Sequence, residues 1–286
     1  MVSENYKFTN IKTLVVGCTP LARKFVYLLE KITDFRGVIN LNPEIGIAKS
    51  NYDYMSDFFS RRPDDVFWTK NINDIETVSW IKGRQPDIIV QCGWSQIFKK
   101  DILEIPKKYC IGVHPSPLPE GRGAAIINWK IIESFGQEFQ WGNSLFKMRE
   151  KTDTGPIIDF EPFMIEPRDD VRTAYLKVDF TTLKMLRRAI PKIEDGTIEL
   201  VPQDDTRATR YYKRAPKDGK IDLSWSSKKI NDYIRALTHP YPGAFLKTKA
   251  GDLTLWAAES DIAPSAFRSL PVGEICDKVR GKGVAV

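Results

Sequence analysis

The sequence predicts an α/β protein with a mostly parallel sheet, followed by a small β-rich domain at the carboxyl end. Three observations carry this prediction. Apolar, β-branched runs alternate with amphipathic helical stretches, beginning with residues 11–18 and 20–32. Several of these runs are continuously apolar, which is typical of parallel strands covered on both faces. After residue 200 the helical pattern gives way to short apolar runs separated by turn residues.

The first half of the chain supplies the buried strands and the helices between them. Residues 11–18 (IKTLVVGC) form a continuous apolar run, and the next stretch places Leu21, Phe25 and Leu28 on one helix face. Because strand–helix–strand crossovers are right-handed and join parallel strands, the predicted sheet is Rossmann-like. Strands are predicted at residues 11–18, 35–39, 87–92 and 109–113, and helices at residues 20–32, 56–60, 73–82, 99–105 and 124–134.

The second half begins with two strands, residues 139–146 and 156–165, on either side of a charged loop. A long helix is predicted over residues 172–190 and is expected to stop at Pro191, because proline lacks an N–H group and clashes with the preceding turn. A polar linker, a helix and three short strands follow at residues 203–220, 227–237, 243–247, 253–257 and 272–275. We therefore predict an α/β domain over residues 1–200 and a linker with a small β domain over residues 201–286.

Composition excludes several classes of protein. Hydrophobic residues make up 42% and charged residues 28% of the 286 residues, as in water-soluble globular proteins. No apolar run approaches about 18 residues, and residues 1–8 carry no signal-peptide core, so we expect no membrane span and a cytoplasmic location. The net charge of +6 favours anionic ligands such as phosphates, but the basic residues are scattered and do not indicate nucleic-acid binding.

Cysteine and histidine usage argues against a metal site. The four cysteines form no CxxC pair and the chain has only two histidines. We therefore expect buried, reduced thiols and no zinc site. The turn at residues 17–20 lacks the GxGxxG pattern, so a dinucleotide site there is not supported.

His114 and Asp153 are the candidate proton-transfer pair. His114 ends the strand predicted at residues 109–113 and begins a loop rich in proline and glycine. Ligands of open α/β sheets bind outside the carboxyl ends of the strands, and Asp153 follows a strand predicted at the same edge. An imidazole held in one tautomer by a carboxylate suits proton transfer near neutral pH. No GxSxG elbow is present, so direct transfer is favoured over covalent catalysis. A histidine that only packs at a strand end is the alternative.

Two separate segments of the chain, one after the other, carry a resemblance to a known family. The first joins residues 113–119 (VHPSPLP), 122–125 (RGAA), 128–129 (NW) and 151–155 (KTDTG). It resembles the signature of folate-dependent formyltransferases, which include methionyl-tRNA, glycinamide ribonucleotide and nucleotide-sugar formyltransferases. The second joins residues 214–222 (RAPKDGKID) and 234–245 (IRALTHPYPGAF), and is similar to the carboxyl-terminal domain of the sugar and methionyl-tRNA branches.

The resemblance implies roles for individual residues. It makes His114 the general acid and base, with Asp153 as its partner. Positions implied to contact the folate are Gln96, Ile97, Phe98, Ser116, Ala124, Arg149, Glu150, Lys151, Thr152 and Asp153. Candidates for the acceptor site are Trp94, Arg122, Tyr211, Tyr212, Lys213 and Arg214. The basic run that ends at Arg214 is read either as a phosphate clamp or as a solvated charged surface. Trp94 is read either as a packing residue or as a stacking platform, and His239 as a structural residue.

The resemblance also implies a reaction. An amine attacks the formyl carbon of 10-formyltetrahydrofolate, a tetrahedral oxyanion forms, and tetrahydrofolate leaves. We expect the acceptor to be a small molecule, a nucleotide-linked amino sugar of the kind used in lipopolysaccharide biosynthesis, because residues 238–245 look closer to the sugar branch. The carboxyl-terminal part also lacks the concentrated basic surface of a tRNA binder. A methionyl-tRNA enzyme and a non-catalytic folate- or nucleotide-binding homologue are the alternatives. A homodimer is left open.

Gly112 departs from the family pattern, which is Asn-x-His. The asparagine amide steadies the oxyanion, and loss of one such donor lowers the rate by about 10² to 10³. Gln96, Asn143 and backbone N–H groups are the candidate substitutes. If nothing substitutes, Gly112→Asn should raise turnover. If glycine is required for a positive φ or for the close approach of a ligand, the same change should lower activity.

Overall fold

The structure is a computed structural model that describes residues 8–258, 277–279 and 283–285. The chain divides into two compact units. The first contains Met1–Ile126, Gln140–Met164 and Tyr175–Lys213; the second contains Ile127–Phe139, Ile165–Ala174 and Arg214–Val286. The last change between the units falls at residue 213, whereas the sequence places the boundary at residue 200, and residues 127–139 and 165–174 belong to the second unit although the sequence places them in the first domain. The reason is that residues 201–213 make their described contacts with the first unit, for example between Gly121 and Thr209.

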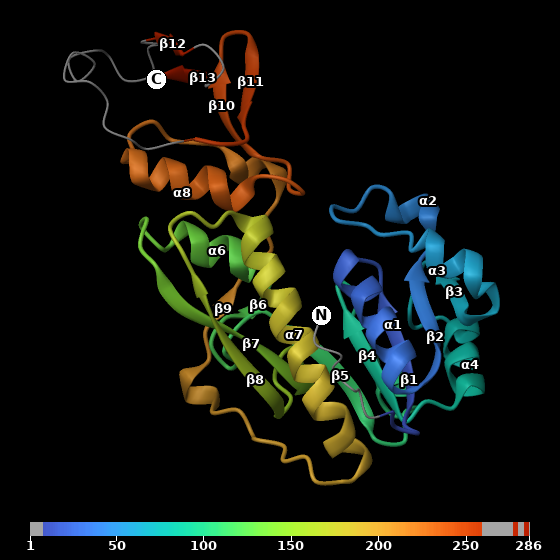
Figure 1. Ribbon diagram of the computed structural model, residues 1–286. Coiled ribbons are helices and arrows are strands. Elements are labelled where there is room, and N and C mark those ends of the chain that lie inside the picture. Colours follow the sequence, from blue (N-terminus) through green and yellow to red (C-terminus); the bar gives the residue numbers. More distant parts are fainter. Residues whose placement is uncertain (1–7, 259–276, 280–282, 286) are drawn as a thin grey trace, which may run out of the picture. The chain divides into compact units, whose positions relative to one another are not determined.

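The first unit is built on a seven-stranded sheet with the order β3-β2-β1-β4-β5-β7-β8 (Figure 1). Its four pairs from β3 to β5 are parallel, and β7 is antiparallel to β5. This confirms the predicted α/β class. The strands are β1 (Lys12–Gly17), β2 (Asp34–Leu41), β3 (Val66–Thr69), β4 (Ile88–Cys92), β5 (Tyr109–His114), β7 (Phe139–Lys147) and β8 (Ile157–Ile165). The strand β3 was not predicted, because its four residues at the sheet edge follow a polar, aromatic stretch that carries no strand pattern.

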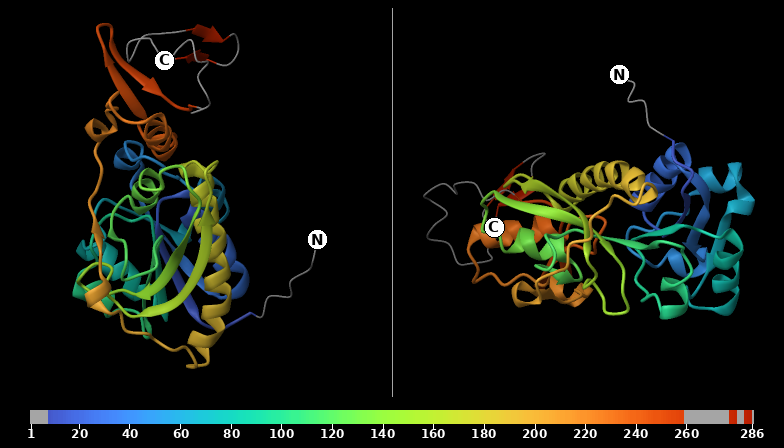
Figure 2. Two further views of the ribbon diagram at one scale, coloured as in Figure 1. Left: turned by 90° about the vertical axis from the view of Figure 1, so that its left-hand side faces the viewer. Right: turned by 90° about the horizontal axis from the view of Figure 1, so that it is seen from below.

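Helices cover both faces of this sheet, as the right panel of Figure 2 shows for α1 and α7 on one side. The core on the α1 and α7 face includes Val15, Val90 and Ile111 from the strands. The opposite core joins Leu14, Ile89 and Cys110 to residues of α4 and α5. The helices that begin before residue 200 are α1 (Pro20–Ile32), α2 (Pro43–Gly46), α3 (Ser56–Arg61), α4 (Ile75–Arg84), α5 (Lys100–Leu103), α6 (Ile126–Ile132) and α7 (Val171–Glu194), with the short 3₁₀ turn η1 (Pro63–Asp65).

The helix α7 continues through Pro191, so the predicted stop there is wrong. Proline removes a single N–H group. Pro191 lies in the last turn of α7, where few helical hydrogen bonds follow. Ile190 and Ile193 are fully buried in the core and hold that turn in place. The helix ends at Glu194, where Lys108 Nζ donates to the carbonyl of Ile193 at 2.7 Å and Gly196 adopts a φ of +72°. The burial of these side chains and the cap supplied by Lys108 therefore stabilise the last turn by more than Pro191 destabilises it.

The second unit contains the helix α8 (Ser227–Leu237) and the antiparallel hairpin β10 (Ala244–Thr248) and β11 (Gly251–Leu255). The hairpin agrees with two of the three predicted strands. The third, at residues 272–275, lies outside the described residues. Short elements complete the chain: β6 (Arg122–Gly123), η2 (Asp205–Arg207), β9 (Arg210–Tyr211), η3 (Pro216–Gly219), β12 (Asp277–Val279) and β13 (Gly283–Ala285).

A buried arginine holds the second unit together. Arg235 pairs with Asp232 at 2.8 Å, donates to the carbonyl of Asp169 at 2.6 Å and donates to Ser134 Oγ at 2.5 Å. Asp232 also accepts the backbone N–H of Gly136 at 2.8 Å. Each charge is therefore paired and hydrogen-bonded, as buried charges must be. No described helix is long and apolar enough to cross a membrane.

Candidate functional site

The site forms where β4 and β5 end at the carboxyl edge of the sheet. Gly112 of β5 lies between Gln91 of β4 and Phe146 of β7 in the sheet register, and His114 lies opposite Ser144. Residues two apart on a strand share a face, so Gly112 and His114 belong to the same face of the sheet. The fold therefore places residues of three neighbouring strands at the edge of the sheet where His114 lies.

The His114 imidazole is buried, with 6% of its surface exposed. Its Nε2 lies 2.7 Å from the backbone carbonyl of Gly121. A carbonyl oxygen only accepts, so Nε2 carries a proton and Nδ1 is the nitrogen that accepts one. Gly121 is itself held by its N–H, which donates to Thr209 Oγ1 at 2.8 Å. The loop carbonyl, and not Asp153 as the sequence suggested, sets the tautomer.

Asp153 faces the other imidazole nitrogen, as predicted. Its Oδ1 lies 3.7 Å from His114 Nδ1, and its Oδ2 accepts the backbone N–H of Gly123 at 2.9 Å. The residue is 7% exposed and adopts a φ of +59°, a conformation that aspartate tolerates better than most side chains. The imidazole of His114 thus lies between a loop carbonyl at Nε2 and a buried carboxylate at Nδ1.

Gln203, in the linker, connects the loop that carries Asp153 to the loop that follows His114. Gln203 Nε2 donates to the carbonyls of Asp153 and Gly155 at 3.0 and 2.7 Å. Its Oε1 accepts from Arg122 Nη2 at 2.7 Å, and the same guanidinium pairs with Asp205 at 2.6 Å. Arg122 is only 5% exposed. Its described contacts thus give it a structural role, and its predicted contact with the acceptor stays a prediction.

The predicted folate positions divide into buried and exposed groups. Ser116 is fully buried, and its Oγ has no hydrogen-bond partner among the described residues. In the turn after β4, Phe98 is buried and Ile97 is 61% exposed, while the Gln96 amide is bound to the backbone of Lys70 and Ile72. Ala124 donates its N–H to the carbonyl of Tyr211 at 3.2 Å. The four positions before Asp153 are exposed: Arg149, Glu150, Lys151 and Thr152.

The predicted acceptor positions also differ in burial and in contacts. Trp94 is buried in the core on the α4 face, and its indole Nε1 has no partner among the described residues. Tyr211 is half-buried, whereas Tyr212 and Lys213 are exposed. Arg214 lies in the second unit, where its guanidinium is 4.5 Å from the Trp129 ring centre and donates to the Tyr233 hydroxyl at 2.7 Å. Lys213 therefore fits a phosphate contact better than Arg214 does.

Gly112 is a glycine because of a neighbouring side chain. A Cβ at this position would lie 2.5 Å from Cζ of Phe146, and Gly112 does not have a positive φ. The sequence offered two reasons for a required glycine, a positive φ and the close approach of a ligand. The first is wrong, and the group that approaches closely is the Phe146 ring and not a ligand. The Phe146 side chain is itself buried, with 6% of its surface exposed.

Both amides suggested as substitutes for the missing asparagine are engaged elsewhere. Asn143 Nδ2 donates to the carbonyl of Val178 and to the hydroxyls of Thr181 and Thr182, and the residue is fully buried. The Gln96 amide is bound to backbone, as described above. The Asn143 amide is therefore not available to an oxyanion without breaking protein contacts, and the Gln96 amide is held at Lys70 and Ile72, which follow β3 and not β5.

The described cysteines are not arranged for covalent catalysis. Cys18, Cys92 and Cys110 are free and buried, as the sequence predicted. Burial raises the pKa of the Cys110 thiol to about 12 and raises the pKa of Cys18 and Cys92 as well. The reactive thiolate is thus rare near neutral pH. Among the described residues no group of histidine, cysteine or acidic side chains is arranged to hold a metal ion.

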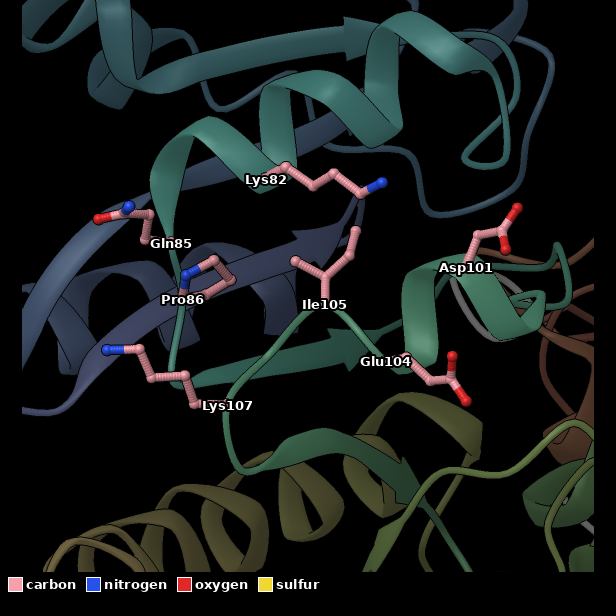
Figure 3. Close-up of a pocket in the computed structure, with 7 residues that line it drawn as sticks. All are labelled: Lys82, Gln85, Pro86, Asp101, Glu104, Ile105 and Lys107. Atoms are coloured by element: carbon pink, nitrogen blue, oxygen red, sulfur yellow. The ribbon is translucent and has the colours of Figure 1, made fainter.

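A surface hollow of 530 Å³ lies at the opposite edge of the sheet (Figure 3). It is lined by charges of both signs, including Lys82, Asp101, Glu104 and Lys107. Pro86 in its wall precedes β4, so the hollow is at the amino end of the strands. It lies away from His114 and is not part of the site.

These features define an α/β protein with a buried histidine–aspartate pair at the carboxyl edge of its sheet. Comparison with known proteins gives the family. Residues 45–190 match the model "Formyl transferase", and residues 213–286 match "Formyl transferase, C-terminal domain". The chain belongs to the formyl transferase family of enzymes, as the sequence motifs indicated.

The relatives and solved structures agree with this assignment. The chain is 34% identical over 194 residues to the bifunctional polymyxin resistance protein ArnA of Wigglesworthia glossinidia brevipalpis; the match covers 68% of this chain but 29% of that protein. A sugar N-formyltransferase from Shewanella sp superposes with a TM-score of 0.67 at 17% identity, covering 89% of this chain and 99% of that one. A 4-N formyltransferase from Francisella tularensis gives a TM-score of 0.67 at 19% identity, with 87% and 98% covered. At these identities the structural matches show the fold alone.

Sequence reasoning missed the residues that support the site. Gln203 and Thr209 lie in a polar linker with no motif, and Phe146 reads as an ordinary strand residue. Gln91 is the exception, because a glutamine in the otherwise apolar run DIIVQC at a strand's carboxyl end is a signal that could have been used.

Proposed function

We propose that this protein transfers a formyl group from 10-formyltetrahydrofolate to the amine of a nucleotide-linked amino sugar. The observation that carries the proposal is the arrangement of His114, with its Nε2 on the Gly121 carbonyl and its Nδ1 facing Asp153. Family membership supplies the reaction class. The sugar branch is favoured by residues 238–245 and by the sugar N-formyltransferases among the structural neighbours.

The residues present fit a folate donor. Ser116 Oγ and Trp94 Nε1 are buried polar atoms without partners among the described residues, and they follow the ends of β5 and β4. A buried polar group left unpaired is costly, so a ligand that hydrogen-bonds these atoms gains free energy on binding. A structure named WlaRD, a sugar 3N-formyl transferase, was determined with dTDP and 5-N-formyl-THF and matches this chain with a TM-score of 0.58 at 22% identity over 80% of its length.

In this proposal the donor supplies the formyl group and the protein moves the proton. The attacking amine becomes positively charged as it adds to the formyl carbon. His114 takes a proton from it at Nδ1 and returns a proton to the leaving nitrogen of the folate. Asp153 stabilises the imidazolium between these two steps. The buried environment of both side chains strengthens this interaction relative to water.

Turnover measurements with 10-formyltetrahydrofolate test the proposal. We expect formyl transfer to at least one of a panel of nucleotide-linked amino sugars, and none to methionyl-tRNA, followed by release of tetrahydrofolate. Transfer to methionyl-tRNA alone would reverse the choice of acceptor. Saturable folate binding without transfer to any amine would favour a non-catalytic homologue.

Lys213 and Arg214 form a matched pair that tests the acceptor site. Lys213→Ala is expected to raise the acceptor KM severalfold and to leave the folate KM unchanged, because the side chain is exposed and basic and suits a phosphate. Arg214→Ala is expected instead to lower stability by about 1–2 kcal/mol through lost cation–π contacts with Trp129 and Tyr233. Steady-state kinetics and thermal unfolding separate the two. An unchanged acceptor KM in Lys213→Ala would remove this residue from the acceptor site.

A further inference from the structure

We propose that Gln91 supplies the side-chain amide that the asparagine at position 112 provides in other family members. The inference rests on the proposed formyl transfer, because it concerns the oxyanion formed in that reaction. Gln91 was assigned no role from the sequence, and it lies on β4 rather than on β5. The donor would thus reach the reacting oxygen from the neighbouring strand.

The sheet register places Gln91 beside the missing side chain. Gln91 pairs with Gly112 between the parallel strands β4 and β5. Paired residues of adjacent strands point to the same face and are separated by one strand spacing of about 4.8 Å. Ile89 and Cys110, the pair two residues earlier, both belong to the core on that face. Gln91 therefore shares the face of Gly112 and His114, and its side chain is one methylene longer than that of asparagine.

The Gln91 amide is oriented toward the carboxyl edge of the sheet. Its Nε2 donates to the backbone carbonyl of Trp94 at 2.8 Å, three residues further along the chain. An amide nitrogen carries two hydrogens, so this bond leaves one free for an acceptor. No other hydrogen bond of this side chain is found among the described residues, and the residue is half-buried. The Trp94 carbonyl thus fixes the amide before a substrate arrives, and such preorganisation makes an oxyanion donor effective.

The other groups near Gly112 do not offer this donor. The Phe146 ring covers the β7 side of Gly112, and the Asn143 amide nitrogen is used by three acceptors. The Gln96 amide is held by the backbone of Lys70 and Ile72, after β3, and Gln96 is not a register partner of Gly112. Among the described side chains in register with Gly112, only Gln91 carries an N–H donor, since Phe146 is apolar. The adjacent strand therefore compensates for the glycine.

The change Gln91→Leu tests the inference, because leucine keeps nearly the same volume and removes the donor. We expect kcat for formyl transfer to fall about 100- to 1,000-fold, with little change in the KM of the folate, the KM of the acceptor or the melting temperature. Gln91→Glu should be at least as slow, since a carboxylate repels an oxyanion. Gln140→Leu is the matched control: this exposed glutamine of β7 lies outside the site, and its replacement should leave kcat unchanged.

Hydrolysis of 10-formyltetrahydrofolate without any acceptor is a second readout, because attack by water passes through the same kind of oxyanion. A Gln91→Leu protein that keeps wild-type rates in both reactions would overturn the inference and leave the proposed function intact. Wild-type hydrolysis without transfer to any amine would overturn the proposed acceptor, and a hydrolysis rate lowered by Gln91→Leu would still support the inference. Wild-type protein that catalyses neither reaction would overturn both.

Discussion

His114→Asn is expected to lower the turnover number at least about 100-fold, which is the usual scale for loss of a general acid and base. The asparagine amide cannot take up a proton as the imidazole does, and its Nδ2 stands at the position of Nδ1, so the 2.7 Å contact of Nε2 with the Gly121 carbonyl is lost. We expect the KM of the folate to change little.

The second histidine of the chain is the control for this experiment. His239 stacks on Trp256 with ring centres 3.9 Å apart in the second unit, which agrees with the structural role predicted for it. His239→Asn should lower the melting temperature but leave kcat unchanged. A folded His114→Asn protein with near-wild-type turnover would eliminate His114 as the proton carrier.

Gly112→Asn is expected to destabilise the protein by about 1–3 kcal/mol, the usual penalty for overpacking a filled core. The new Cβ would lie 2.5 Å from Cζ of Phe146, and Met148 Cγ is only 3.2 Å away. The Phe146 ring is buried, so a shift of the ring displaces its packed neighbours. We therefore expect a lower melting temperature and no gain in turnover, although the change restores the asparagine of the family pattern.

A double-mutant cycle with Phe146→Ala shows whether the clash is the cause. Phe146→Ala alone should cost about 3–5 kcal/mol, as deletion of a buried aromatic ring does. The double variant should be less destabilised than the sum of the single changes, because the asparagine enters the space left by the ring. Gly83→Asn is the control, since a Cβ at Gly83 meets nothing within 4 Å. An unchanged melting temperature with faster turnover in Gly112→Asn would contradict this account and show that the native site lacks a donor.

How well the sequence predicts the structure differs from residue to residue. The strand that carries His114 ends at the predicted place, and Asp153 lies beside the imidazole, because both depend on local patterns at the carboxyl ends of strands. The end of α7 was missed, since the signal from Pro191 is local whereas burial of Ile190 and Ile193 is not. Arg214 shows the same limit: a basic run is visible in sequence, but the aromatic rings that hold its guanidinium are not.

The sequence by itself determined the α/β class, the order of the main strands and helices, the family, and the His114–Asp153 pair. These follow from hydrophobic periodicity and from short motifs, which are properties of consecutive residues. Only the tertiary structure decided how the pair is held and which side chain lies in register with Gly112. Gly121, Gln203 and Gln91 acquire their places through contacts with Thr209, with Arg122 and with the register partner Gly112. The physical reason is that hydrogen-bond partners and strand register join residues that are distant along the chain, and no periodicity in the sequence encodes such pairs.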